Sequence, residues 1–168
     1  MIMHPTAPAR GRAGRRTLKA LAVTATTLGA VALTAGPASA ETNCTGSGNA
    51  TVCLGIDGVG GGRFAVHVGI DVHVSRAVAQ EYLDDAGDPF TVWIKGDDGE
   101  FLFRLPVTAM GATDLSGLSG DFDLIVPGTA LNEDSGTDEI IAVVTLTDTD
   151  TNTVTATYTS GRIVGNWP

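Results

Sequence analysis

The sequence predicts an all-β protein, a single antiparallel β-sandwich of about seven strands with one short helix. Three observations lead to this prediction. Apolar and polar residues alternate through several segments, as they do in strands with one buried face. Turn signals rich in glycine and aspartate separate these segments by about 8–12 residues. Only the segment from residue 76 to about residue 85 has the apolar spacing of a helix.

Residues 1–40 have the organisation of a secretory signal peptide that is removed on export. The apolar stretch 21–35 is shorter than the roughly 20 residues that cross a membrane, and residues 37–40 end in the A-x-A pattern read by signal peptidase. We therefore expect a secreted, extracellular protein without a membrane span, exported by the general or the twin-arginine route. The basic residues that precede the apolar stretch are Arg10, Arg12, Arg15, Arg16 and Lys19.

The chain after residue 40 has room for one domain with its own core, since 128 residues remain. We divide it into a glycine-rich N-terminal segment, residues 41–62, and a β-sandwich domain, residues 63–168. Cys44 and Cys53 lie in the N-terminal segment and are the only cysteines of the chain. In an oxidising compartment we expect them to form a disulfide.

The predicted mature chain is strongly acidic. All nineteen acidic residues follow residue 40, against five of the ten basic residues, which gives a net charge of −14 where the full chain has −9. Such a surface repels phosphate backbones and anionic lipids, so it argues against nucleic-acid and membrane-surface binding. It suits divalent cations, a basic partner or simple solvation outside the cell.

The apolar alternation is longest over residues 64–74, which predicts a half-buried strand. Ser75 then suits the N-cap of the short helix. Residues 90–95 and 100–107 flank a turn of glycine and aspartate, and this pattern predicts a hairpin. The following segments read as a loop, a strand, an acidic loop and a strand with apolar residues on both faces: 108–120, 121–126, 131–138 and 139–147.

Threonine occupies every odd position of the segment 145–159, on both sides of an acidic centre. We expect the two arms to form a hairpin. Both threonine rows share a face only if paired residue numbers sum to an even value, so the loop must contain an odd number of residues. Thr147 would then lie opposite Thr153, and Leu146 opposite Val154.

Asp148, Asp150 and Asn152 are the candidate metal ligands, and Ca²⁺ is the cofactor that they suggest. Their D-x-D-x-N spacing begins a calcium loop, because alternate residues of a tight loop can direct their oxygens to one ion. The rest of the EF-hand pattern is missing, since Thr153 stands where that pattern needs glycine and Thr159 where it needs glutamate. The same residue types are also common in turns that bind no metal.

A second acidic group is expected at the opposite end of the sheet from this loop. Antiparallel strands would bring the acidic connection 96–100 next to the acidic connection 131–138. Such a pole resembles the calcium-binding pole of C2-type sandwiches. The layout that the strands, the turn spacing and the single helix predict is immunoglobulin-like or C2-like. Solvated loop carboxylates are the alternative. The residues concerned are Asp97, Asp98, Glu100, Glu133, Asp134 and Asp138.

The sequence assigns no catalytic and no cofactor-binding residue, because it contains neither G-x-S-x-G nor H-E-x-x-H. His67, Asp71 and His73 share one strand face, on which the two histidines are roughly 20 Å apart and so too distant to hold one ion. Asp71 and His73 are neighbours on that face and could share a site. Trp93 is either an exposed binding platform or part of a second buried face.

These features favour a non-catalytic extracellular binding or interaction module, whose partner is an extracellular protein or glycan. An inhibitor of an extracellular hydrolase is one alternative, with the predicted loop Thr108–Gly120 as its inhibitory segment. A small glycan-active enzyme that uses a pair of carboxylates is a further alternative.

Overall fold

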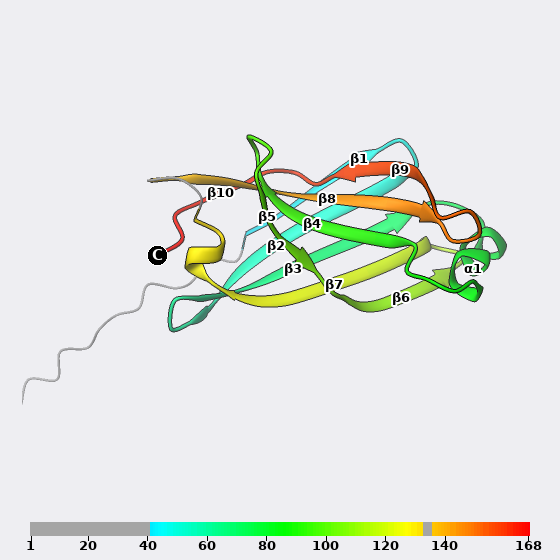
Figure 1. Ribbon diagram of the computed structural model, residues 1–168, viewed down its shortest axis with the longest axis horizontal. Helices are drawn as coiled ribbons and strands as arrows, with labels where there is room; N and C mark the ends of the chain where they lie inside the picture. The colour runs from blue at the N-terminus through cyan, green and yellow to red at the C-terminus, as the bar shows by residue number, and fades with distance from the viewer. Residues whose placement is uncertain (1–40, 133–135) are drawn as a thin grey trace, which may run out of the picture. The chain divides into compact units, whose positions relative to one another are not determined.

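Two antiparallel sheets form the two layers of a β-sandwich in the computed structural model, which describes residues 41–132 and 136–168 (Figure 1). This arrangement confirms the predicted fold class. The first sheet contains, in spatial order, β1 (Glu41–Ser47), β2 (Ala50–Gly60), β3 (Arg63–Val72), β7 (Gly117–Pro127) and β6 (Val107–Thr113). The second contains β10 (Ile163–Gly165), β8 (Asp138–Asp148), β4 (Phe90–Gly96) and β5 (Phe101–Leu105), and β9 (Thr153–Thr159) also pairs with β8.

The described residues form ten strands, three more than the sequence pattern predicts. The N-terminal segment 41–62 supplies β1 and β2, so it belongs to the first sheet. Cys44 and Cys53 lie directly opposite each other in the β1–β2 pair, with their Cα atoms 4.0 Å apart, and form the predicted disulfide. The predicted signal peptide, residues 1–40, lies outside the described residues. Among the described residues, no helix reaches the length and apolarity that a membrane crossing requires.

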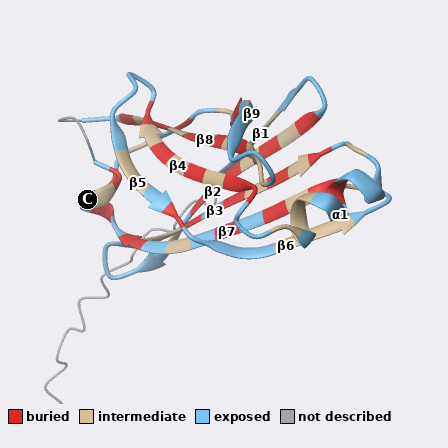
Figure 2. Cartoon of the chain, turned by 45° about the vertical axis from the view of Figure 1, so that its right-hand side comes forward, coloured by how far each residue is buried: buried red, intermediate tan, exposed pale blue. Residues whose placement is uncertain are grey.

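Alternating apolar residues of both sheets form one core between the layers (Figure 2). Every second residue of β3 from Val66 to Val72 is buried, as the alternation predicts. Phe90 of β4 and Phe122 of β7 pack edge to face across the layers, with ring centroids 6.3 Å apart. Such aromatic pairs stabilise a core beyond the area that they bury.

The predicted helix is α1 (Arg76–Asp84), and a 3₁₀ turn, η1 (Gly128–Ala130), follows β7. The Ser75 hydroxyl accepts a hydrogen bond from the Val78 backbone N–H at 3.3 Å, which confirms Ser75 as the N-cap. Ala79 is fully buried, and α1 lies beside β6 and β7 (Figure 1). The C-terminal end of the helix lies near the β8–β9 turn, since Asp85 directly after the helix accepts a hydrogen bond from Thr149.

The prediction of a loop over Thr108–Gly120 is wrong, because most of this segment forms the β6–β7 hairpin. Its small residues suit this hairpin, because side chains of the paired strand lie close to them. A Cβ on Gly111 would stand 3.3 Å from Ser119 Oγ. The turn is short and includes Gly117 at φ +74°. Leu115 is 90% exposed at its tip. A long protruding inhibitory loop is thus not present in this described part of the chain.

The predicted parity of the threonine hairpin is confirmed away from the turn, but both predicted residue pairs are wrong. Leu146 lies opposite Ala156 instead of Val154. Thr145 lies opposite Thr157, which places the threonines on one face. A register shift then pairs Thr147 with Val154 instead of Thr153. The cause is a β-bulge, which adds one residue to β9 and leaves an even loop of residues 149–152.

Candidate functional site

The predicted metal ligands lie in the β8–β9 turn, where hydrogen bonds within the turn already engage one of them. Asp148 Oδ1 accepts hydrogen bonds from the Thr151 backbone N–H and from the Thr151 hydroxyl, each at 2.9 Å. Asn152 adopts a positive φ of 53°, a conformation that asparagine tolerates better than most residues. These are the local roles that aspartate and asparagine have in turns.

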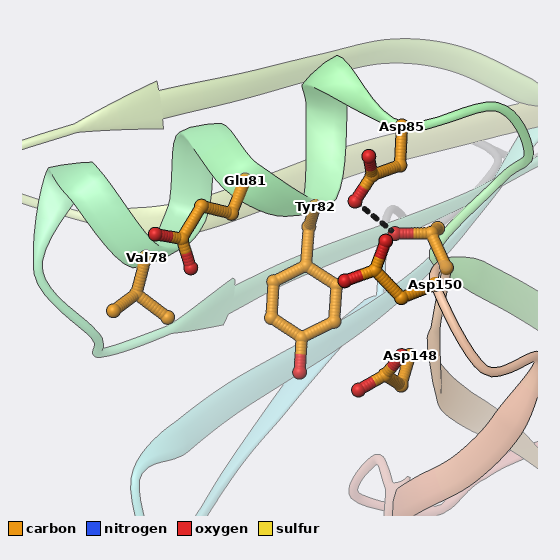
Figure 3. Close-up of a pocket in the computed structure, with 7 residues that line it drawn as sticks. Val78, Glu81, Tyr82, Asp85, Asp148 and Asp150 are labelled. Carbon is orange, nitrogen blue, oxygen red and sulfur yellow. Dashed lines mark hydrogen bonds between the residues drawn. The ribbon is translucent and has the colours of Figure 1, made fainter.

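This turn faces the end of α1, and together they line a shallow pocket of about 160 Å³ (Figure 3). Asp85 follows the helix, and its Oδ2 accepts a hydrogen bond from the Thr149 hydroxyl at 3.4 Å. Four carboxyl groups border the pocket, two from each side, so it is strongly acidic. Its lining residues are Val78, Glu81, Tyr82, Asp85, Asp148, Thr149 and Asp150.

The two aspartates of the turn differ in their electrostatics. Hydrogen bonds from Thr151 lower the pKa of Asp148. The charge of Asp85 raises the pKa of Asp150, and partial desolvation and the charge of Asp148 add to the effect. Sequence reasoning missed Asp85, because it lies more than 60 residues from the turn in the chain and only the tertiary fold brings it there.

The arrangement of these groups does not by itself define a metal site. Within residues 41–132 and 136–168, no group of three or more His, Cys, Asp or Glu side chains could hold a metal ion. Calcium binding by Asp148, Asp150 and Asn152 therefore stays a prediction.

The second acidic group is assembled only in part. The β4–β5 turn adjoins the start of β8, as predicted, because Asp97 N–H donates to the Glu139 carbonyl at 2.8 Å. Asp97 also pairs with Arg162 at 3.0 Å, and Asp98 accepts from the Glu100 backbone N–H. Asp138 is buried, in contrast to a solvated loop carboxylate. Glu133 and Asp134 lie outside the described residues.

Trp93 is half-buried on the outer face of the second sheet, where Phe101 of β5 joins it. Their rings pack edge to face with centroids 5.2 Å apart, and Lys95 Nζ lies 3.7 Å from the centroid of the Phe101 ring. Phe101 itself is 58% exposed. Sequence reasoning placed Trp93 and Lys95 on one face but missed Phe101, because a register shift in the β4–β5 pair turns it outward.

Cross-strand pairing arranges this outer face in three rows, which we call the Trp93 face. The rows include two of the five basic residues that follow residue 40 and none of the nineteen acidic ones. The three rows therefore carry a positive charge on a chain whose net charge is strongly negative. The rows are Thr91, Thr145 and Thr157; Arg104, Trp93, Val143 and Thr159; and Phe101, Lys95 and Ile141.

His67 meets two aspartates on the outer face of the first sheet, but neither is Asp71. Its Nδ1 lies 2.7 Å from Asp123 Oδ1, and its Nε2 lies 3.8 Å from Asp121 Oδ1. The Thr108 hydroxyl donates to Asp123 Oδ2 at 2.7 Å. The hydrogen bond from Thr108 lowers the pKa of Asp123, and the hydrogen bond and charge of His67 lower it further. Partial desolvation raises this pKa, but the net shift is downward.

The structure does not bring Asp71 and His73 into this group. Asp71 lies opposite Ser119, and His73 follows the end of β3. Sequence reasoning missed Asp121 and Asp123 as partners of His67, although they alternate on one face of the predicted strand 121–126. The sequence pattern does not show that β3 pairs with β7, and this pairing is what brings the two aspartates to His67.

Comparison of the chain with protein-family models, with curated proteins and with solved structures gave no match.

Proposed function

We propose that the chain is a secreted, non-catalytic binding module that holds an extracellular protein or glycan on the Trp93 face. The observation that carries this proposal is the packed group of Trp93, Phe101 and Lys95 on the outside of the sandwich. Exposed aromatic side chains that are already held in place lose little conformational freedom on binding, and tryptophan and arginine dominate binding energy at interfaces.

The surroundings of this group support the same proposal. Threonine, valine and isoleucine residues flank it on β8 and β9, so the face offers methyl groups and hydroxyls to a partner. Lys95 and Arg104 take part in none of the ion pairs found among the described residues. They are therefore available to a partner, while the acidic remainder of the surface repels anionic ones.

Binding to a panel of insoluble polysaccharides and of purified extracellular proteins tests the proposal, with the Trp93→Ala and Phe101→Ala variants beside the unaltered chain. We expect the unaltered chain to bind at least one ligand of the panel, and each variant to weaken that binding by about 10-fold or more. Leu115→Ala is the matched control, because it removes a more exposed apolar side chain from the tip of the other sheet. Binding that survives Trp93→Ala and is lost with Leu115→Ala overturns the proposal in favour of the hairpin tip.

A further inference from the structure

His67 is oriented by the groups behind its ring. Asp123 is directly opposite His67 in the β3–β7 pair, and its two carboxylate oxygens accept from His67 and Thr108, both at 2.7 Å. An ionised carboxylate only accepts hydrogen bonds, so the Nδ1 that faces Asp123 carries the proton. In the neutral ring, Nε2 is then the nitrogen with the free lone pair.

That nitrogen lies 3.8 Å from Asp121 Oδ1. Gly69 lies between them, opposite Asp121 in the register. A Cβ built on Gly69 would stand 3.6 Å from His67 Nε2 and 3.7 Å from Asp121 Oδ1. The imidazole nitrogen and the carboxylate oxygen therefore converge over a position with no side chain.

We propose that His67 Nε2 and Asp121 Oδ1 bind a divalent transition-metal ion of the zinc class, with Asp123 and Thr108 as positioning residues. Zinc lies about 2.0–2.2 Å from imidazole nitrogen and carboxylate oxygen, so one ion can reach two atoms that are 3.8 Å apart. A carboxylate behind the ring is the usual partner of a metal-binding histidine, because it holds the tautomer and increases the basicity of the ligand.

The chemistry of these donors separates the site from the acidic pocket of the β8–β9 turn. A neutral imidazole suits zinc, copper or nickel, whereas calcium prefers oxygen ligands alone. The side chains of His67 and Asp121 are 46% and 57% exposed, so the remaining coordination positions are open. Water or a donor group of a binding partner would fill them, and the metal would then link the partner to the first sheet.

Zinc titration of the purified chain, followed by calorimetry and by NMR of the histidine rings, tests this site. We expect saturable binding that shifts the ring signals of His67, and Nδ1 as its protonated nitrogen before zinc is added. His67→Gln and Asp121→Asn should each abolish that binding. Asp123→Asn should weaken it about 10- to 100-fold while both ligands stay in place. Calcium should leave the His67 signals unchanged.

Two further variants control for the fold and for unspecific binding. Gly69→Ala retains every donor atom and fills the space beneath the ion with a methyl group at ordinary contact distances, so we expect a folded protein with weakened zinc binding. His73→Gln removes the other histidine of the described chain and should bind zinc as the unaltered protein does. Zinc binding that Asp121→Asn leaves unchanged, or that His73→Gln removes, overturns the proposal.

Discussion

Asp148 and Asp150 are two residues apart in the β8–β9 turn, yet the fold shifts their pKa values in opposite directions. Asp148 accepts two hydrogen bonds from Thr151, which stabilise its charged form and lower its pKa. Asp150 faces the carboxylate of Asp85, which destabilises its charged form and raises its pKa. One turn therefore combines a carboxylate that favours folding with a carboxylate that opposes it.

We predict opposite effects on stability from Asp148→Asn and Asp150→Asn at neutral pH. Asp148→Asn should lower the melting temperature, because hydrogen bonds to a neutral acceptor are weaker than those to a carboxylate. Asp150→Asn should raise it, because the repulsion from Asp85 is removed. Thermal melts of both variants and of the unaltered chain at neutral pH measure the two differences.

The pH dependence of these differences follows from the direction of each pKa shift. The contribution of Asp148 is complete above its unfolded pKa and is lost as the pH falls through its lower folded pKa. The penalty of Asp150 is complete above its raised folded pKa and disappears as the pH falls through its unfolded pKa. Melts continued to acidic pH should thus show the Asp150→Asn advantage shrinking first. Equal and pH-independent effects of the two variants would contradict this account.

The calcium prediction for Asp148, Asp150 and Asn152 has its own test. Calcium at 100 times its Kd would stabilise the folded state by about 2.7 kcal/mol and raise the melting temperature by several degrees. Melts in EDTA and in excess Ca²⁺ measure that shift, with Asp150→Asn as the variant that should reduce it. A melting temperature independent of Ca²⁺ would assign these carboxylates to turn formation and solvation alone.

Removal of the disulfide should lower stability without changing the layout of the first sheet. Cys44 and Cys53 face each other in a hairpin that backbone hydrogen bonds already define. The bond closes a short loop, so its effect is mainly on the unfolded chain and on the order of 2–3 kcal/mol. Denaturant unfolding of the Cys44→Ser/Cys53→Ser double variant measures this difference. A loss of β-sheet circular dichroism under native conditions would show instead that the hairpin needs the bond to form.

Local patterns were sufficient for the parts of the fold that depend on neighbouring residues. Alternation predicted the strand at 64–74 and the cap at Ser75 predicted the helix, because burial of one face and satisfaction of backbone N–H groups act over a few residues. The segment 108–120 was misjudged because its glycine and serine residues are typical of loops. Pairing with a neighbouring strand made it a hairpin.

The candidate sites depend on contacts that no local pattern encodes. Asp150 meets Asp85, His67 meets Asp123, and both pairs join segments more than 50 residues apart in the chain. The threonine register failed for a related reason: parity decides which face the threonines share but not which residues pair, and one bulge changes even the parity at the turn. Knowledge of the strand order would have given the His67 group, since Asp121 and Asp123 alternate as any strand does.

Alanine substitutions at Gly120 and Gly46 should show whether glycine is needed for close packing between the sheets or for strand formation. A Cβ on Gly120 would lie 2.9 Å from the ring of Phe122 and 3.1 Å from that of Phe90. Both rings are almost fully buried and packed against each other, so neither can move without disturbing the contact between the layers. We expect Gly120→Ala to lower the free energy of unfolding by about 1–3 kcal/mol.

Gly46 is the matched control, because it also lies in a strand of the first sheet but has no atom within 4 Å of an added Cβ. Gly46→Ala should leave stability unchanged or raise it by up to about 1 kcal/mol, since alanine restricts the unfolded chain more than glycine does. Denaturant unfolding of both variants gives the comparison. A similar loss of stability at the two positions would mean that the strands themselves need glycine. A loss of stability confined to Gly120→Ala would show that glycine is needed at the Phe90–Phe122 contact, which joins the two sheets.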